Sequence, residues 1–219
     1  MTRKILSFLV TFLFLAGAVW FINSRQINLK FGSDGTAGAN SPDRVVKEFS
    51  FEKPPTMTIN SEKSYEAEID TTKGVMKFEL FSKETPKTVN NFVFLAKEGF
   101  YENTFFHRII KSFMIQGGDP KGDGTGGPGY KFNDELITRD YERGVIAMAN
   151  SGSNTNGSHF FIMHEKNDLQ KNYVIFGKIT EGLDVLDNIA SVPVANNGNG
   201  EESLPLEKVY INKITISEK

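Results

Sequence analysis

Cysteine is missing from this 219-residue sequence, and histidine and tryptophan are scarce, with three copies and one copy. Without cysteine the chain has no disulfide framework, no thiolate metal site and no cysteine nucleophile. The three histidines do not form the HExxH pattern of a zinc hydrolase, which argues against that class of enzyme. Any chemistry of this chain therefore has to come from other side chains.

Clustered positive charge is also missing, because the formal net charge is −2 and no long run of Lys and Arg occurs. Phosphate binding needs such a cluster, so we expect no nucleic-acid partner. Phenylalanine, in contrast, is abundant, with 19 copies in a chain that is 39% hydrophobic. Length and composition together predict one globular domain with appendages, built around a phenylalanine-rich core.

The longest uncharged apolar run, residues 5–22, lies near the N-terminus and follows Arg3 and Lys4. As a helix it would span roughly 27 Å, close to the thickness of the bilayer core. The preceding positive charges favour a cytoplasmic N-terminus, so the bulk of the chain is expected outside the cytoplasm. Residues 1–22 are thus either a membrane anchor, which we favour, or a signal peptide cleaved after the small-x-small pattern of residues 16–18, which releases a secreted protein.

Residues 23–62 change in character, since Gly, Ser, Asn and Pro crowd together and no hydrophobic period persists. This composition predicts a linker. The folded domain is expected over residues 63–219. It opens with two alternating runs, residues 65–69 and 74–81, that predict a β-hairpin.

Two helices are expected in this domain. The first is capped by Thr85, has Pro86 in its first turn and ends at Gly99, and the second covers residues 183–190. Elsewhere short apolar runs alternate with turns rich in Gly and Asn. Many short strands with two helices predict a mainly β fold, an antiparallel barrel capped by the helices, and the apolar N-terminal helix stands apart from it.

Five motifs follow one another at a spacing that resembles the cyclophilin family: FHRII (106–110), FMIQGGD (113–119), DGTGG (123–127), MANSGSNTNGSHFFI (148–162) and YVIFGKI (173–179). The resemblance covers about residues 64–217. It implies a closed eight-stranded antiparallel barrel with two capping helices. It also implies a monomeric peptidyl-prolyl cis-trans isomerase that needs no cofactor and no metal.

The resemblance also implies the site residues. Arg108 matches the family's catalytic arginine. The residues expected to bind substrate are His107, Phe113, Met114, Gln116, Ala149, Asn150, Ser151, Phe161, Leu169 and Tyr173. The chain departs from the family at Tyr173, where a histidine is common, and at Asp168, where many members carry a tryptophan.

These residue types suit the isomerisation of Xaa-Pro bonds. In the twisted transition state the proline nitrogen gains a lone pair, and a fixed cationic N–H donor favours that state over the planar ones. Arg108 is such a donor, and Phe113, Met114, Phe161 and Leu169 would hold the proline ring. The sequence therefore predicts an isomerase that acts on proline-containing polypeptides during the folding of exported proteins. The alternative is a proline-peptide binding module whose catalysis is incidental.

Overall fold

The computed structural model describes residues 28–29 and 47–219 of the chain. Within these ranges, none of the helices combines the length and the apolar character needed to cross a membrane. The apolar run 5–22, expected as an N-terminal helix, lies outside the described residues, as does most of the expected linker.

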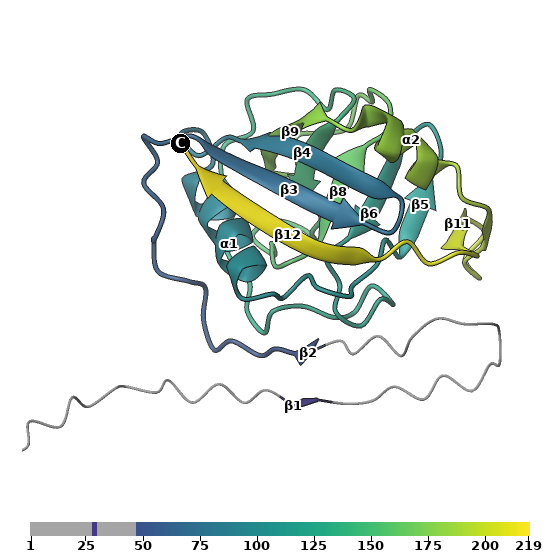
Figure 1. Cartoon of the computed structure of the whole chain (residues 1–219), viewed down its shortest axis with the longest axis horizontal. Helices are drawn as coiled ribbons and strands as arrows, with labels where there is room; N and C mark the ends of the chain where they lie inside the picture. Colours follow the sequence, from purple (N-terminus) through teal and green to yellow (C-terminus); the bar gives the residue numbers. More distant parts are fainter. Residues whose placement is uncertain (1–27, 30–46) are drawn as a thin grey trace, which may run out of the picture.

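One antiparallel sheet of eight strands makes up most of the domain, and it curls around the core (Figure 1). Its spatial order is β12 (Ile211–Glu218), β3 (Tyr65–Thr71), β4 (Gly74–Leu80), β9 (Ile175–Glu181), β7 (Val145–Met148), β8 (Phe160–Met163), β6 (Met114–Gly117) and β5 (Arg108–Ile110). Two further antiparallel pairs are β1 (Asn28–Leu29) with β2 (Lys47–Glu48), and β10 (Val194–Asn196) with β11 (Glu202–Pro205). The predicted mainly β architecture and the hairpin of β3 and β4 are confirmed.

The predicted closure of the barrel is wrong, because the sheet keeps two edges, β12 and β5. An isolated bridge between Phe105 and Tyr210 joins the segments that precede these edge strands. A continuous ladder does not form because β5 is only three residues long. Instead, β11 packs beside β5, where the short hairpin of β10 and β11 lies in Figure 1.

The central strands β7 and β8 are buried along their whole length. Successive side chains point to opposite faces of a strand, so each of these strands contributes to two apolar clusters. Phe160 and Ile162 belong to the large core cluster together with α1 (Pro86–Lys97) and α2 (Leu183–Ala190). Phe161 and Met163 belong to a smaller cluster on the opposite face of β8, which we call the outer cluster.

Both helices lie where the sequence predicts them, although α1 is capped differently. Thr85 is the residue before its first turn, but the side chain of Thr85 makes no capping hydrogen bond. The Glu135 carboxylate caps the helix instead, accepting from the backbone N–H of Lys87 at 3.0 Å and of Thr88 at 2.7 Å. A carboxylate at this end also interacts favourably with the helix dipole.

Residues 49–60, which precede the first long strand, lie against the domain, and we call them the strap. Phe51 donates its backbone N–H to the Pro128 carbonyl at 2.8 Å, and its ring lies 5.1 Å from that of Phe94 on α1. Farther along, Asn90 of α1 accepts from the backbone N–H of Thr58 at 2.8 Å. The strap therefore connects α1 with the loop that contains Pro128.

Candidate active site

The outer cluster brings most of the expected apolar site residues together. Met114 on β6 and Phe161 on β8 are buried in it, and Phe113, Leu169 and Tyr173 pack against them while remaining partly exposed. The rings of Phe161 and Tyr173 meet edge to face, with centroids 5.5 Å apart. The cluster therefore presents an apolar surface to solvent, of the kind that can receive a proline ring.

Arg108 lies at the edge of this cluster. It is the first residue of β5, and its register partner on β6 is Gln116. Its Nη1 atom lies 3.8 Å from the Met114 Sδ and donates to the Gln116 Oε1 at 3.4 Å. A guanidinium thus stands beside apolar side chains, as expected for Arg108 from the sequence.

A carboxylate that sequence reasoning missed binds the same guanidinium. Glu201, in the turn between β10 and β11, accepts from the Arg108 Nε at 2.8 Å and from its Nη2 at 2.6 Å. The two residues are 93 positions apart in sequence. The run Asn196–Glu201 is typical of a tight turn, but only the fold places that turn beside β5.

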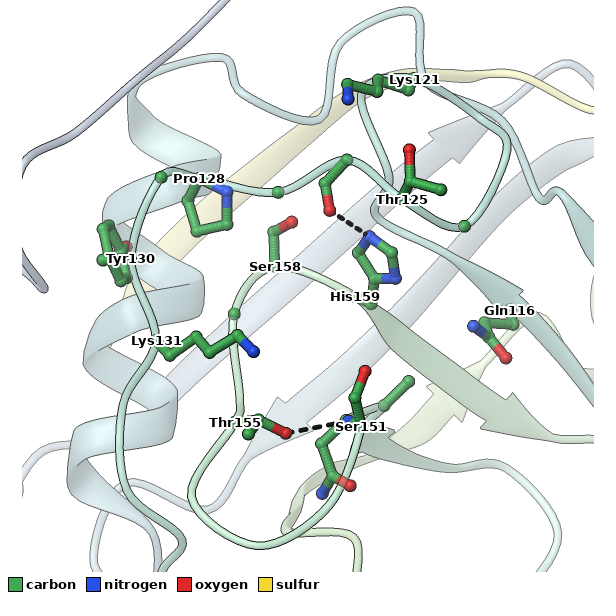
Figure 2. A pocket seen from close by; sticks show the side chains of 17 residues that line it. Gln116, Lys121, Thr125, Pro128, Tyr130, Lys131, Ser151, Thr155, Ser158 and His159 are labelled. Atoms are coloured by element: carbon green, nitrogen blue, oxygen red, sulfur yellow. Dashed lines mark hydrogen bonds between the residues drawn. The ribbon is translucent and has the colours of Figure 1, made fainter.

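A cavity of about 930 Å³ adjoins the outer cluster (Figure 2). Gln116, Ala149, Asn150 and Ser151 line it, whereas Arg108 and the aromatic site residues do not. Ala149 also packs against the outer cluster, so it connects the two regions. The expected substrate-binding residues therefore fall into two adjoining groups, one at the outer cluster and one at the cavity.

The loop 119–131 forms one wall of the cavity and is organised by a buried carboxylate. Asp119 is 1% exposed, and it accepts from the backbone N–H groups of Lys121, Asp123 and Gly124 at 2.8, 3.1 and 2.6 Å. In Figure 2, His159 reaches across to this loop, and its Nε2 donates to the Gly126 carbonyl at 2.9 Å. The wall is thus fixed from both sides.

The Asn150 and Ser151 segment forms the opposite rim. Asn150 donates from its Nδ2 to the Asn172 carbonyl at 2.8 Å and accepts from the Gly152 N–H at 3.2 Å. The Ser151 N–H donates to the Thr155 Oγ1 at 2.9 Å, which is visible in Figure 2. The side chain of Asn150 therefore holds the rim in place.

His107 lines neither the cavity nor the outer cluster. Its Nε2 lies 3.4 Å from the Gln116 amide nitrogen, and its Nδ1 is buried with no hydrogen-bond partner among the described residues. Burial and the neighbouring His159 lower the pKa of His107 to about 4. The imidazole is therefore neutral at physiological pH, and its part in substrate binding stays a prediction.

Comparisons with known proteins identify the family of this chain. The profile of the family described as cyclophilin type peptidyl-prolyl cis-trans isomerase/CLD matches residues 66–216. Peptidyl-prolyl cis-trans isomerase CYP18-1 of Arabidopsis thaliana is 46% identical over 154 residues, which cover 68% of this chain and 93% of the relative. The Mycobacterium tuberculosis protein named "Probable peptidyl-prolyl cis-trans isomerase B" is 38% identical over 209 residues, 85% of this chain and 67% of the relative.

A solved structure shows the same fold. The crystal structure of a cyclophilin type peptidyl-prolyl cis-trans isomerase from Cryptosporidium parvum superposes with a TM-score of 0.66 at 39% identity, covering 71% of this chain and 99% of that one. Because the profile spans more than half of the chain and the Arabidopsis thaliana relative matches over 93% of its length at 46% identity, the resemblance seen in the sequence motifs is confirmed. The chain belongs to the cyclophilin-type peptidyl-prolyl cis-trans isomerase family and is an enzyme of that type.

Proposed function

We propose that this isomerase acts on exported, proline-containing polypeptides and that Arg108 is its catalytic residue. The observation that carries the proposal is the position of the guanidinium, beside Met114 and the partly exposed side chains of the outer cluster. A proline ring seated on Phe113, Met114 and Phe161 would bring its amide nitrogen next to this cation. A structure of the related Cryptosporidium parvum isomerase was obtained in the presence of the dipeptide Ala-Pro, which supports an Xaa-Pro ligand.

The guanidinium acts on the barrier to rotation. An amide bond resists rotation by about 18–20 kcal/mol because its planar form is stabilised by resonance. Twisting the bond returns a lone pair to the proline nitrogen, so a hydrogen bond donated there is stronger in the transition state than in either planar state. Arg108 supplies cationic N–H donors in a fixed planar fork. The step therefore needs neither a nucleophile nor an acid–base pair.

The rest of the substrate is proposed to run from the outer cluster to the cavity. Ala149 touches both regions, and Gln116 joins Arg108 to the cavity wall. Residues before the proline would lie along Ala149 and Asn150, with the preceding side chains at the cavity. This path accounts for the expected substrate-binding residues of both groups.

Substitution of Arg108 tests the catalytic proposal. We expect R108A to lower kcat/KM on a proline peptide about 100-fold, the usual effect of losing one transition-state donor, without unfolding the protein. R108K, which keeps the charge but loses the planar fork, should also be slow. R139A is the matched control, because Arg139 binds Glu84 through the same two nitrogens, also at 2.8 and 2.6 Å. Its guanidinium stacks on the buried ring of Phe81, which is not among the expected substrate-binding residues.

Equal catalytic efficiency of R108A and the wild type would refute the role of Arg108. Tight binding of proline peptides with negligible turnover in the wild type would favour the binding module over the foldase. Turnover on several unrelated Xaa-Pro peptides, with little preference among them, supports the foldase.

The compartment is proposed from the sequence. Residues 5–22 are uncharged and follow Arg3 and Lys4, a pattern typical of a segment that enters a membrane with its N-terminus inside. We propose that this segment anchors the isomerase, as a monomer, with its catalytic domain outside the cytoplasm. The folding of exported chains is the process that such a placement serves.

N-terminal sequencing of the mature protein, together with membrane fractionation, tests this placement. A chain that begins at residue 1 or 2 and sediments with membranes supports the anchor. A chain that begins near Val19 and is released shows a cleaved signal peptide instead. A full-length chain in the cytoplasmic soluble fraction would overturn the proposed compartment but leave the isomerase activity untouched.

A further inference from the structure

The turn between β10 and β11 holds Glu201 in a defined position. Asn197 donates its backbone N–H to the Glu201 carbonyl at 2.9 Å, and its Nδ2 lies 3.4 Å from the Glu201 Oε2. The Asn197 Oδ1 in turn accepts from the backbone N–H of Asn199 at 2.9 Å. The carboxylate is therefore presented by an internally hydrogen-bonded turn rather than by an extended loose segment.

Glu201 grips one edge of the Arg108 guanidinium. Both oxygens are used, one on Nε and the other on Nη2, which is the two-point geometry that fixes a planar fork most firmly. The side chains of Arg108 and Glu201 are only 33% and 36% exposed. Hydrogen bonds from Arg108 and Ser203 lower the pKa of Glu201 to about 2, so the carboxylate stays ionised across the range of any activity assay.

The opposite side of the guanidinium remains directed toward the substrate region. Arginine carries five N–H donors, of which Glu201 takes one on Nε and one on Nη2. Nη1 faces Met114 and Gln116, at 3.8 and 3.4 Å. The hydrogen bonds to Glu201 therefore leave donors available on the Nη1 side, where the proposed function places the proline amide.

We propose that Glu201 is a positioning residue, which holds Arg108 by its Nε–Nη2 edge and so aims Nη1 at the Xaa-Pro bond. This inference rests on the proposed catalytic role of Arg108. Misorientation of a reacting group by about 1 Å costs up to about 100-fold in rate, so a fixed guanidinium is worth far more than its ion pair adds to stability. A carboxylate that competed with substrate would instead cover the donors on the Nη1 side.

The test compares E201A and E201Q in the full-length chain, kept in mild detergent, with turnover measured on an Ala-Pro peptide. We expect E201A to lower kcat about tenfold while KM changes by less than about twofold, because the guanidinium loses its orientation and the binding surface stays intact. E201Q should be intermediate, because only one of its two terminal atoms can accept. E84A is the matched control, since it breaks the equivalent ion pair with Arg139, and its kcat should equal that of the wild type.

Two further measurements separate positioning from general stability. In an R108A background, E201A should have no additional effect on kcat, since the residues act as a unit. The Arg108 Nε–H resonance should shift in E201Q, which differs from the wild type by one atom, and stay unchanged in E84A.

The inference would be overturned if the kcat of E201A equalled or exceeded that of the wild type. It would also be overturned if E201A lowered kcat by the same factor in the wild type and in the R108A background. The proposed function fails separately, if R108A alone turns over at the wild-type rate.

Discussion

At the scale of single residues, His107 links the stability of the site to pH. Its pKa of about 4 in the folded protein lies below the 6.5 of an unperturbed histidine, chiefly because burial disfavours the imidazolium. Well above pH 6.5 the imidazole is neutral in both the folded and the unfolded state and makes the stability independent of pH. As the pH falls from 6.5 to 4, the unfolded chain gains the proton first, and the folded state loses stability.

We therefore expect the wild type to lose about 2 kcal/mol more unfolding free energy than H107Q between pH 7 and pH 4.5. Urea unfolding at the two pH values measures the difference. Asp119 raises the pKa of His107, whereas His159 and Arg108 lower it, so these neighbours stay unchanged in the comparison. Parallel losses in both proteins would show that His107 protonates equally easily in the folded and unfolded states.

Gly126 is a second residue whose identity is fixed by its surroundings. A Cβ at this position would overlap the Oδ1 atom of the buried Asp119, which accepts from the backbone N–H of Lys121. We expect G126A to lower the unfolding free energy by about 2 kcal/mol and to displace the cavity wall. G127A is the matched control, because a Cβ there meets nothing within 4 Å. Urea unfolding of the two variants checks this, and equal stability would contradict it.

At the scale of elements, the local sequence pattern predicts those strands and helices whose formation depends on local contacts. The alternation of residues 65–81 predicts β3 and β4, and Pro86 with the apolar face of residues 89–96 predicts α1. The Glu135 cap was not predictable, because it comes from a loop residue 47 positions beyond Thr88 in the sequence. The open edge at β5 and the position of Glu201 beside it also depend on long-range packing, so the local pattern does not predict them.

The Glu135 cap is testable on α1 itself. E135A leaves the backbone N–H groups of Lys87 and Thr88 without their carboxylate acceptor, so we expect a loss of about 1 kcal/mol in unfolding free energy. E142A is a suitable control, because it removes an exposed ion pair with Lys166 and leaves the backbone hydrogen bonds of Glu142 in place. An unchanged urea midpoint in E135A, with amide exchange of Lys87 and Thr88 as slow as in the wild type, would show that the cap is dispensable.

At the scale of the whole molecule, one face of the central strands packs into the large core and the other face contributes to the outer cluster. Phe160 and Ile162 pack into the large core with both helices, while Phe161 and Met163, on the same strand, face the outer cluster. The motif GSHFFI thus contributes both to the large core and to the outer cluster, where the apolar residues that the sequence assigns to the site lie together. Met114 and Phe161 lie on β6 and β8, where the alternation of a strand predicts which face they occupy. Phe113, Leu169, Tyr173, Glu201 and the strap lie in segments without such a period.

The strap extends the folded unit beyond the family match, which begins at residue 66. Phe49 and Phe51 pack against the large core, and Ile59 is buried in it at 8% exposure. A chain that starts at residue 47 keeps these contacts, and a chain that starts at residue 63, where the sequence places the domain boundary, loses all of them. We therefore expect the shorter chain to be less stable by about 3 kcal/mol.

Loss of the strap contacts should also affect the cavity. The backbone N–H of Phe51 donates to the Pro128 carbonyl, and the Phe51 ring lies 6.3 Å from the ring of Tyr130. F51A in the longer chain should therefore speed amide exchange around Pro128 and Tyr130 and lower stability by about 2 kcal/mol, while M57A, at an exposed side chain, should do neither. Equal unfolding free energies for the chains that start at residues 47 and 63 would mean that the strap only rests on the domain. If only the shorter chain and F51A lose unfolding free energy, the strap is part of the structure that shapes the cavity.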